Sequence, residues 1–191
     1  MGKGRLEAFT DGVIAIIITI MVLEMKVPQG ADLAALRADL PVFLVYGLSY
    51  VNVAIFWNNH HHMLHATGRV DGRVLWANLF LLFWLSLVPF VIRWMDETGF
   101  AALPTSAYGI VLAMAAVGYT LTQRALIASN GKDSPLAAAL GSDLKGKASL
   151  AFYIAAIPLA FLSPWLAIAL YIVVALMWFV PDRRIEPLAR K

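Results

Sequence analysis

The residues of this chain that could do chemistry lie in two short stretches. All four histidines fall between positions 60 and 65. His61 and His65 are spaced i, i+4, and His62 and His65 i, i+3, so on a helix two imidazoles could face one metal ion. The second stretch, Arg5 to Asp11, brings a carboxylate to the start of an apolar segment. An aspartate and histidines in such places could bind a metal, relay protons or join helices by hydrogen bonds.

Other catalytic chemistry is missing from the sequence. There is no cysteine, which excludes disulfides, thiol catalysis and cysteine-based metal sites. No serine has a matched base, and no Walker loop or Rossmann glycine pattern occurs. Membrane di-iron oxygenases need several histidine clusters, whereas this chain has one. We therefore expect a protein that is not an enzyme and has no cofactor, with a metal site on the histidines as an alternative.

Composition indicates a membrane protein. Of the residues, 61% are apolar and 14% charged, and the mean hydropathy is +0.75, whereas soluble domains are about half apolar and a quarter charged. The apolar residues form long blocks such as Leu79–Ile92. This pattern predicts a polytopic membrane protein and argues against soluble enzymes and nucleic-acid partners. A net charge of +3 is typical of membrane proteins with basic loops.

The apolar blocks predict an all-α membrane protein of six transmembrane helices in a single domain, residues 1–191. Crossing a bilayer core of about 30 Å takes about 20 helical residues. The last two helices depend on dividing one block at Leu162-Ser163-Pro164, a turn-forming triplet, and one long tilted helix is the alternative. The charged tail from Pro181 is expected to lie at the lipid surface. The expected helices cover residues 5–25, 40–62, 73–95, 101–127, 147–162 and 165–181.

Basic residues set the expected orientation. With six helices, 12 of the 15 lysines and arginines lie on one face, and Lys26, Arg37 and Arg93 lie on the other. The positive-inside rule then places both termini in the cytoplasm. A five-helix model would reduce the bias to 8 against 7. The first apolar segment ends without a small-residue cleavage site and is expected to be retained.

The first helix has unusual chemistry for a membrane span. Gly12–Leu23 is its longest stretch without an ionisable group, 12 residues, and reaches only about 18 Å. The helix therefore fits better inside a bundle or beside water than against lipid. Asp11 needs a partner at membrane depth, either Arg5 or polar groups of other helices. Alternatively, Thr10 and Asp11 cap a helix start at the interface.

A stripe along this helix has two interpretations. Ile16, Thr19, Ile20 and Leu23 follow i, i+3, i+4, i+7 spacing and share one helix face. Such a stripe is ordinarily a packing seam. In a symmetric oligomer it would instead form stacked rings, in which aliphatic side chains gate by dewetting and threonine hydroxyls replace part of an ion's hydration shell.

Polar side chains also interrupt the other apolar helices. They predict interhelical hydrogen bonds, each worth about 0.6–2 kcal/mol. These residues are Asn52, Asn78, Ser86 and Arg93. Val117-Gly118-Tyr119-Thr120 shares residues with a potassium-channel filter, but its order is wrong and it lies within an apolar helix, so we interpret it as coincidence.

Several separated motifs resemble one known family. Arg5-x-x-x-Phe9-Thr10-Asp11 is followed by Trp57-x-x-His60-His61, Asn78 and Pro89-Phe90. In this order and spacing they resemble bacterial members of the lysosomal potassium channel family, the transmembrane protein 175 type. The family's signature has serine where this chain has Thr10, and the hydroxyl is kept. The resemblance covers the whole chain in helix count and about the first 95 residues in motifs.

The resemblance implies a potassium-selective cation channel in the bacterial inner (cytoplasmic) membrane. Its partners would be the lipid bilayer, potassium ions and three further copies of itself in a homotetramer, with the first helix lining the pore. Ile16 matches the family's aliphatic constriction and Thr19 its hydroxyl layer, so K⁺ in transit would pass near both. Ile20 and Leu23 would form further hydrophobic rings.

For the signature the resemblance implies a structural role, which ties the first helix to its neighbours. His62 and His65 are outside the motif and receive no role. A proton- or ion-coupled secondary transporter that uses Asp11 and the His60–His65 cluster is the alternative. The residues expected in the structural network are Arg5, Phe9, Thr10, Asp11, Trp57, His60, His61 and Asn78.

Overall fold

The computed structural model describes residues 2–140 and 143–179, and within these stretches the chain is helical and has no strand. The expected end of the last helix at 181 and the charged tail lie outside the described residues. The helices are α1 (Lys3–Leu23), α2 (Leu33–Ala38), α3 (Leu40–His65), α4 (Gly72–Ser86), α5 (Val88–Glu97), α6 (Ala102–Asn130), α7 (Pro135–Leu140), α8 (Leu144–Leu162) and α9 (Pro164–Phe179).

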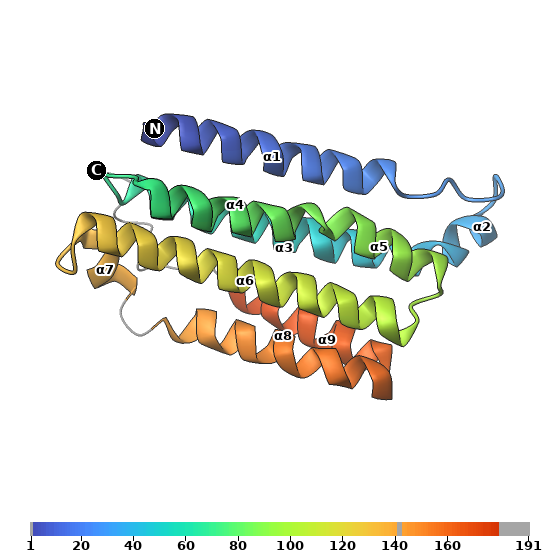
Figure 1. Ribbon diagram of the computed structural model, residues 1–191. Helices are drawn as coiled ribbons and strands as arrows, with labels where there is room; N and C mark the ends of the chain where they lie inside the picture. Colours follow the sequence, from blue (N-terminus) through green and yellow to red (C-terminus); the bar gives the residue numbers. More distant parts are fainter. Residues whose placement is uncertain (1, 141–142, 180–191) are drawn as a thin grey trace.

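The long helices form a bundle in which the helix axes are roughly aligned and successive long helices run in opposite directions (Figure 1). Five segments of the described chain are long and apolar enough to cross a membrane: α1, α3, α4 together with α5, α6, and α8. The sixth apolar helix, α9, is shorter, at 16 residues. This is the architecture of a multi-pass membrane protein, and the predicted all-α membrane fold is confirmed at that level.

The span 72–97 is divided at Leu87, where the sequence predicts one continuous helix over 73–95. Pro89 lies just beyond the break. A proline has no N–H to donate to the carbonyl four residues earlier, and its ring crowds that turn. The helix is therefore interrupted at Leu87, while α4 and α5 together remain one apolar span.

Helix α6 lies at the centre of the packing and contacts α4, α5, α8 and α9. A Cβ on Gly118 would lie 2.8 Å from the Cα of Leu81, so the missing side chain lets the backbones of α6 and α4 approach closely. Val117–Thr120 lies inside this continuous helix. The segment is therefore not a filter loop, and its likeness to one is a coincidence, as we expected from the sequence.

The core contains polar groups that join helices. Tyr108 and Tyr171 are fully buried, with ring centroids 5.1 Å apart. The Tyr108 hydroxyl lies 2.8 Å from the Ser49 hydroxyl, and the Tyr171 hydroxyl donates to the backbone oxygen of Thr105. Each tyrosine therefore buries its ring and also satisfies its hydroxyl.

The predicted interhelical hydrogen bonds form at three of the four polar positions. Asn52 accepts from Tyr153 across 3.4 Å, and Asn78 and Arg93 bond to residues outside their own helices. Ser86 instead donates to the backbone oxygen of Phe83 on its own helix. The prediction is wrong for Ser86 because a serine in a helix readily bonds back to the preceding turn.

Candidate functional site

Helix α1 lies at the edge of the bundle (Figure 1) and packs against α3, α4 and α5. Its buried side chains recur every three or four residues, which places them on one face. The buried residues are Leu6, Thr10, Ile14, Ile17 and Met21. The packing of α1 therefore buries one face and leaves the other largely exposed within the described chain.

The opposite face is the stripe identified in the sequence. Ile16, Ile20 and Leu23 are 59%, 40% and 75% exposed. Thr19 is also exposed, and its hydroxyl donates to the backbone oxygen of Ala15 at 2.8 Å. Because the hydroxyl proton is used within the helix, the oxygen lone pairs remain available to a ligand.

An apolar groove runs beside this stripe, between α1 and α5, with a volume of about 820 Å³. Ile16, Ile20 and Phe90 are among its lining residues. At one end Arg93 donates hydrogen bonds to Glu24 and to Glu97. Charged side chains that pair with one another therefore line one end of a mostly apolar groove, at the C-terminal end of α1.

A buried polar network joins α1, α3 and α4. The side chain of Asn78 donates from Nδ2 to the hydroxyl oxygen of Thr10 at 2.9 Å. Its Oδ1 lies 2.7 Å from Nε2 of His60. Since an amide oxygen can only accept, Nε2 of His60 is the donor. All three side chains are buried, so the network fixes how α1 sits on its two neighbours.

Asp11 has a partner at the surface of the bundle. Trp57 donates from Nε1 to Oδ1 of Asp11 at 2.8 Å, and the Trp57 ring stacks on His61 with centroids 5.9 Å apart. Among the described residues no ion pair joins Arg5 to Asp11. Of the two partners expected for Asp11, Arg5 or a polar group of another helix, the structure therefore shows the polar group of another helix.

The remaining signature residues lie outside these contacts. Arg5 is exposed and Phe9 is 48% exposed, on the side of α1 away from the bundle core. The structure therefore brings together Thr10, His60 and Asn78 in one group and Asp11 with Trp57 in a second.

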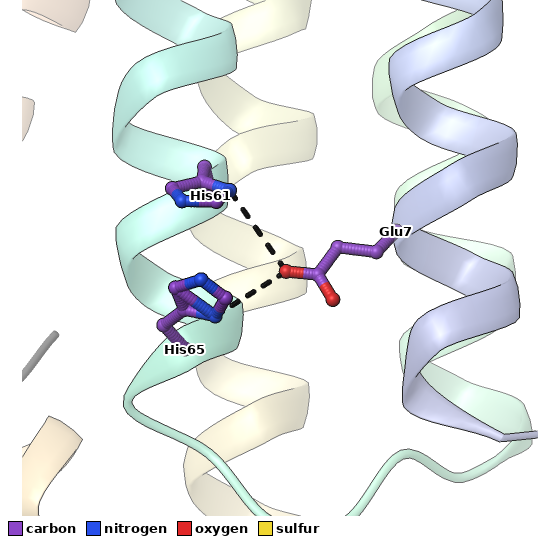
Figure 2. A group of neighbouring side chains, drawn as sticks. All are labelled: Glu7, His61 and His65. Carbon is purple, nitrogen blue, oxygen red and sulfur yellow. Dashed lines mark ion pairs between the residues drawn. The ribbon is translucent and has the colours of Figure 1, made fainter. Parts of the chain in front are cut away.

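Glu7 is a residue that the sequence interpretation missed. Its carboxylate points toward His61 and His65 on α3 (Figure 2), with Oε1 3.4 Å from Nδ1 of His65. The signal that could have found it is helical spacing. Glu7 follows buried Leu6 and precedes buried Thr10 by three residues, so it lies near the packed face of α1.

Known proteins are similar to this chain in sequence and in fold. The family model described as "Endosomal/lysosomal potassium channel TMEM175" matches residues 5–89. A potassium channel from Chryseobacterium sp. (strain P1-3) is 50% identical over 186 residues, 97% of each chain. The crystal structure of a lysosomal potassium-selective channel TMEM175 homolog from Chamaesiphon minutus superimposes with a TM-score of 0.83 at 27% identity, and the match covers 95% of this chain and 98% of the other.

A more distant relative is named for conducting a different ion. The human endosomal/lysosomal proton channel TMEM175 is 35% identical over 96 residues, which cover 44% of this chain and 19% of the human protein. All of these relatives are named channels, in agreement with the expectation of a protein that is not an enzyme. From the close relative that matches almost end to end, the structural match and the family model, the chain belongs to the TMEM175 family.

Proposed function

We propose that this protein is a potassium-selective cation channel of the bacterial inner membrane, in which K⁺ passes along the exposed face of α1. The observation that carries the proposal is the stripe Ile16, Thr19, Ile20 and Leu23, which faces away from the bundle although most of it is apolar. Two relatives that match over most of their length, from Chryseobacterium and Chamaesiphon minutus, are named potassium channels.

A pore of this kind requires several copies of the chain. One copy presents a single α1 at its edge, and closed symmetry is the usual way to surround an axis with identical surfaces. We infer a homotetramer with four α1 helices around the pore, in which the groove beside α1 is covered by a neighbouring copy. In this arrangement α9 is a sixth span, and both termini are cytoplasmic.

Permeation then follows from the chemistry of the stripe. Rings of Ile16, Ile20 and Leu23 exclude water when the helices are close, and they admit a partly dehydrated ion when the helices separate. Thr19 supplies hydroxyl oxygens in the same path. K⁺ is larger and more weakly hydrated than Na⁺, so removing part of its water costs less free energy, which favours its passage.

The polar contacts on the other side of α1 have a structural role in this proposal. Thr10, Asn78 and His60 hold the packed face, and Asp11 with Trp57 holds its edge. Without them α1 could rotate about its axis, and the stripe would no longer face the pore. We assign the same supporting role to His61, which stacks on Trp57. Arg5 and Phe9 are exposed in one copy and would take this role against a neighbouring copy of the chain.

Two substitutions in the stripe test the proposal. Ile16→Asn should raise single-channel conductance because an amide wets the constriction, and Thr19→Ala should weaken selectivity for K⁺ over Na⁺. Val22→Asn is the matched control. Val22 is 48% exposed on the same helix but lies about 120° around the axis from Ile16. Unchanged currents in both stripe variants would contradict a pore along this face.

A proton- or ion-coupled transporter is the second candidate. It is favoured by the carboxylates of Glu7 and Asp11 near the histidines of α3, and by vertebrate relatives named proton channels. Asp11→Asn separates the two candidates. Asparagine keeps an oxygen that can accept from Trp57, so a channel retains its current, whereas a transporter that protonates Asp11 loses its flux.

A further inference from the structure

Glu7, His61 and His65 bring three potential metal ligands together outside the proposed pore. Glu7 lies near the start of α1, and the histidines lie on the last two turns of α3 (Figure 2). Oε1 of Glu7 is 3.4 Å from Nδ1 of His65 and 3.9 Å from Nδ1 of His61. One ligand atom from each residue lies within 4.8 Å of the other two.

This geometry is close to that of a tetrahedral zinc site. Zinc binds histidine nitrogen and carboxylate oxygen at about 2.0–2.2 Å, so two ligands of one tetrahedral ion lie about 3.3–3.5 Å apart. The Glu7–His65 distance of 3.4 Å already fits. The Glu7–His61 distance of 3.9 Å requires closure by about half an ångström, which rotation of an imidazole can supply.

One oxygen of the Glu7 carboxylate has no hydrogen-bond donor among the described residues. Its Oε1 is shielded from solvent and accepts no hydrogen bond from the described residues. A buried acceptor without a partner is unfavourable by about 1–3 kcal/mol. Ring nitrogens turned toward it help only if they carry a proton, and two unprotonated nitrogens would repel it. A cation held between the three atoms removes this conflict.

The surroundings would let an ion enter and would hold the ligands in place. The side chains of His61 and His65 are 36% and 40% exposed, so water can reach the cluster and supply a fourth ligand. Trp57 stacks on the His61 ring, and the rings of His61 and His65 lie 4.2 Å apart. Each imidazole therefore packs against a neighbouring ring, which favours orientations near the observed one and still allows the small rotation that binding requires.

We propose that Glu7, His61 and His65 bind one Zn²⁺ per chain, with water as the fourth ligand, and that the ion cross-links the start of α1 to the end of α3. Nitrogen and carboxylate donors suit Zn²⁺, whereas K⁺ takes oxygen ligands, so this site is separate from the ion path. A bound ion would hold one end of the helix that carries the stripe, and this consequence alone rests on the proposed function.

Metal binding to the purified full-length protein tests the site. After treatment with a chelator, titration calorimetry with ZnCl₂ should show one Zn²⁺ per chain. Co²⁺ bound in its place should give the intense visible absorption of a tetrahedral complex. Glu7→Gln and His65→Gln should each weaken Zn²⁺ binding by at least about tenfold and reduce the Co²⁺ absorption. His62→Gln, which changes a histidine outside the cluster, is the matched control and should bind as the unchanged protein does.

Several outcomes would overturn the site. Absence of Zn²⁺ binding by the unchanged protein would show that the three residues form only an ion pair. Equal affinity in Glu7→Gln, His65→Gln and His62→Gln would place the metal elsewhere. The stoichiometry and the Co²⁺ spectrum of the unchanged protein test the site even where a variant fails to fold. Because no current is measured, failure of this site is distinguishable from failure of the channel proposal.

Discussion

Replacement of Asn78 by leucine tests the buried network most severely. The substitution keeps a side chain of similar size but removes both amide contacts of Asn78, to Thr10 and to His60. It leaves a hydroxyl oxygen and an imidazole N–H without their partner, and both side chains are buried, at 0% and 2% exposure. We therefore expect a large loss of stability from a change that adds apolar surface within a membrane span.

The size of the loss follows from the two orphaned groups. A buried polar group left unsatisfied costs about 1–3 kcal/mol, so two cost about 2–6 kcal/mol. In membranes the unfolded chain also finds partners, and measured interhelical bonds average about 0.6 kcal/mol with a maximum of about 1.7 kcal/mol. We expect the lower part of the range, a loss of about 2–3 kcal/mol in the free energy of unfolding.

Unfolding of the purified protein in mixed detergent and SDS micelles measures this change. Asn52→Leu is the matched control, because Asn52 is also buried but its bond with Tyr153, at 3.4 Å, is longer than the bonds of Asn78 to Thr10 and His60, so this variant should lose less. In a double-mutant cycle, Thr10→Val and Asn78→Leu should couple by about 0.5–1.5 kcal/mol. A loss below about 0.5 kcal/mol for Asn78→Leu, or one no larger than for Asn52→Leu, would refute the reasoning.

Three further predictions concern other contacts. Gly118→Ala places a methyl group against the backbone of α4 and should lower the stability by about 1–3 kcal/mol in the same unfolding assay; no loss would mean that the helices separate freely. Trp57→Phe keeps an aromatic ring, although a smaller one, and removes the indole N–H that bonds to Asp11, so it should lower the stability by about 1 kcal/mol, and an unchanged value would show that the bond contributes nothing. Asp71 caps α4, and the bond it accepts from the backbone N–H of Val74 is the main cause that lowers the pKa of its carboxyl. The cap therefore stabilises the protein at a pH above the ordinary carboxyl pKa of about 4, and this stabilisation is lost as the pH falls through the lowered pKa. At pH 7 the melting temperature of Asp71→Ala should lie below that of the unchanged protein, and the two should converge in acid. A difference that stays constant with pH would contradict this assignment.

Some of the fold could be predicted from the sequence because the relevant physics is local. Long apolar blocks predict membrane helices whatever their neighbours are. Asn78, placed within such a block, predicts a hydrogen bond to another helix, since a polar side chain in hydrocarbon needs a partner. The spacing of Ile16, Thr19 and Leu23 predicts a common helix face. In the structure this face points away from the bundle.

Other features depend on how helices distant in sequence rotate and meet. Glu7 faces His61 and His65 only because α1 and α3 pack antiparallel, so that the start of one lies beside the end of the other. Trp57 rather than Arg5 contacts Asp11 for the same reason. Helical periodicity gives the faces of each helix, but it does not determine which faces touch.

A bi-ionic reversal potential is the most direct test of potassium selectivity in this protein. Purified protein in a planar bilayer would separate a K⁺ solution from a Na⁺ solution, and current would be recorded against voltage. We expect single-channel currents that reverse at a potential shifted toward the K⁺ equilibrium, with a smaller shift for Thr19→Ala. Reversal near zero in the unchanged protein, or slow flux in liposomes without channel currents, would contradict a potassium-selective pore along α1.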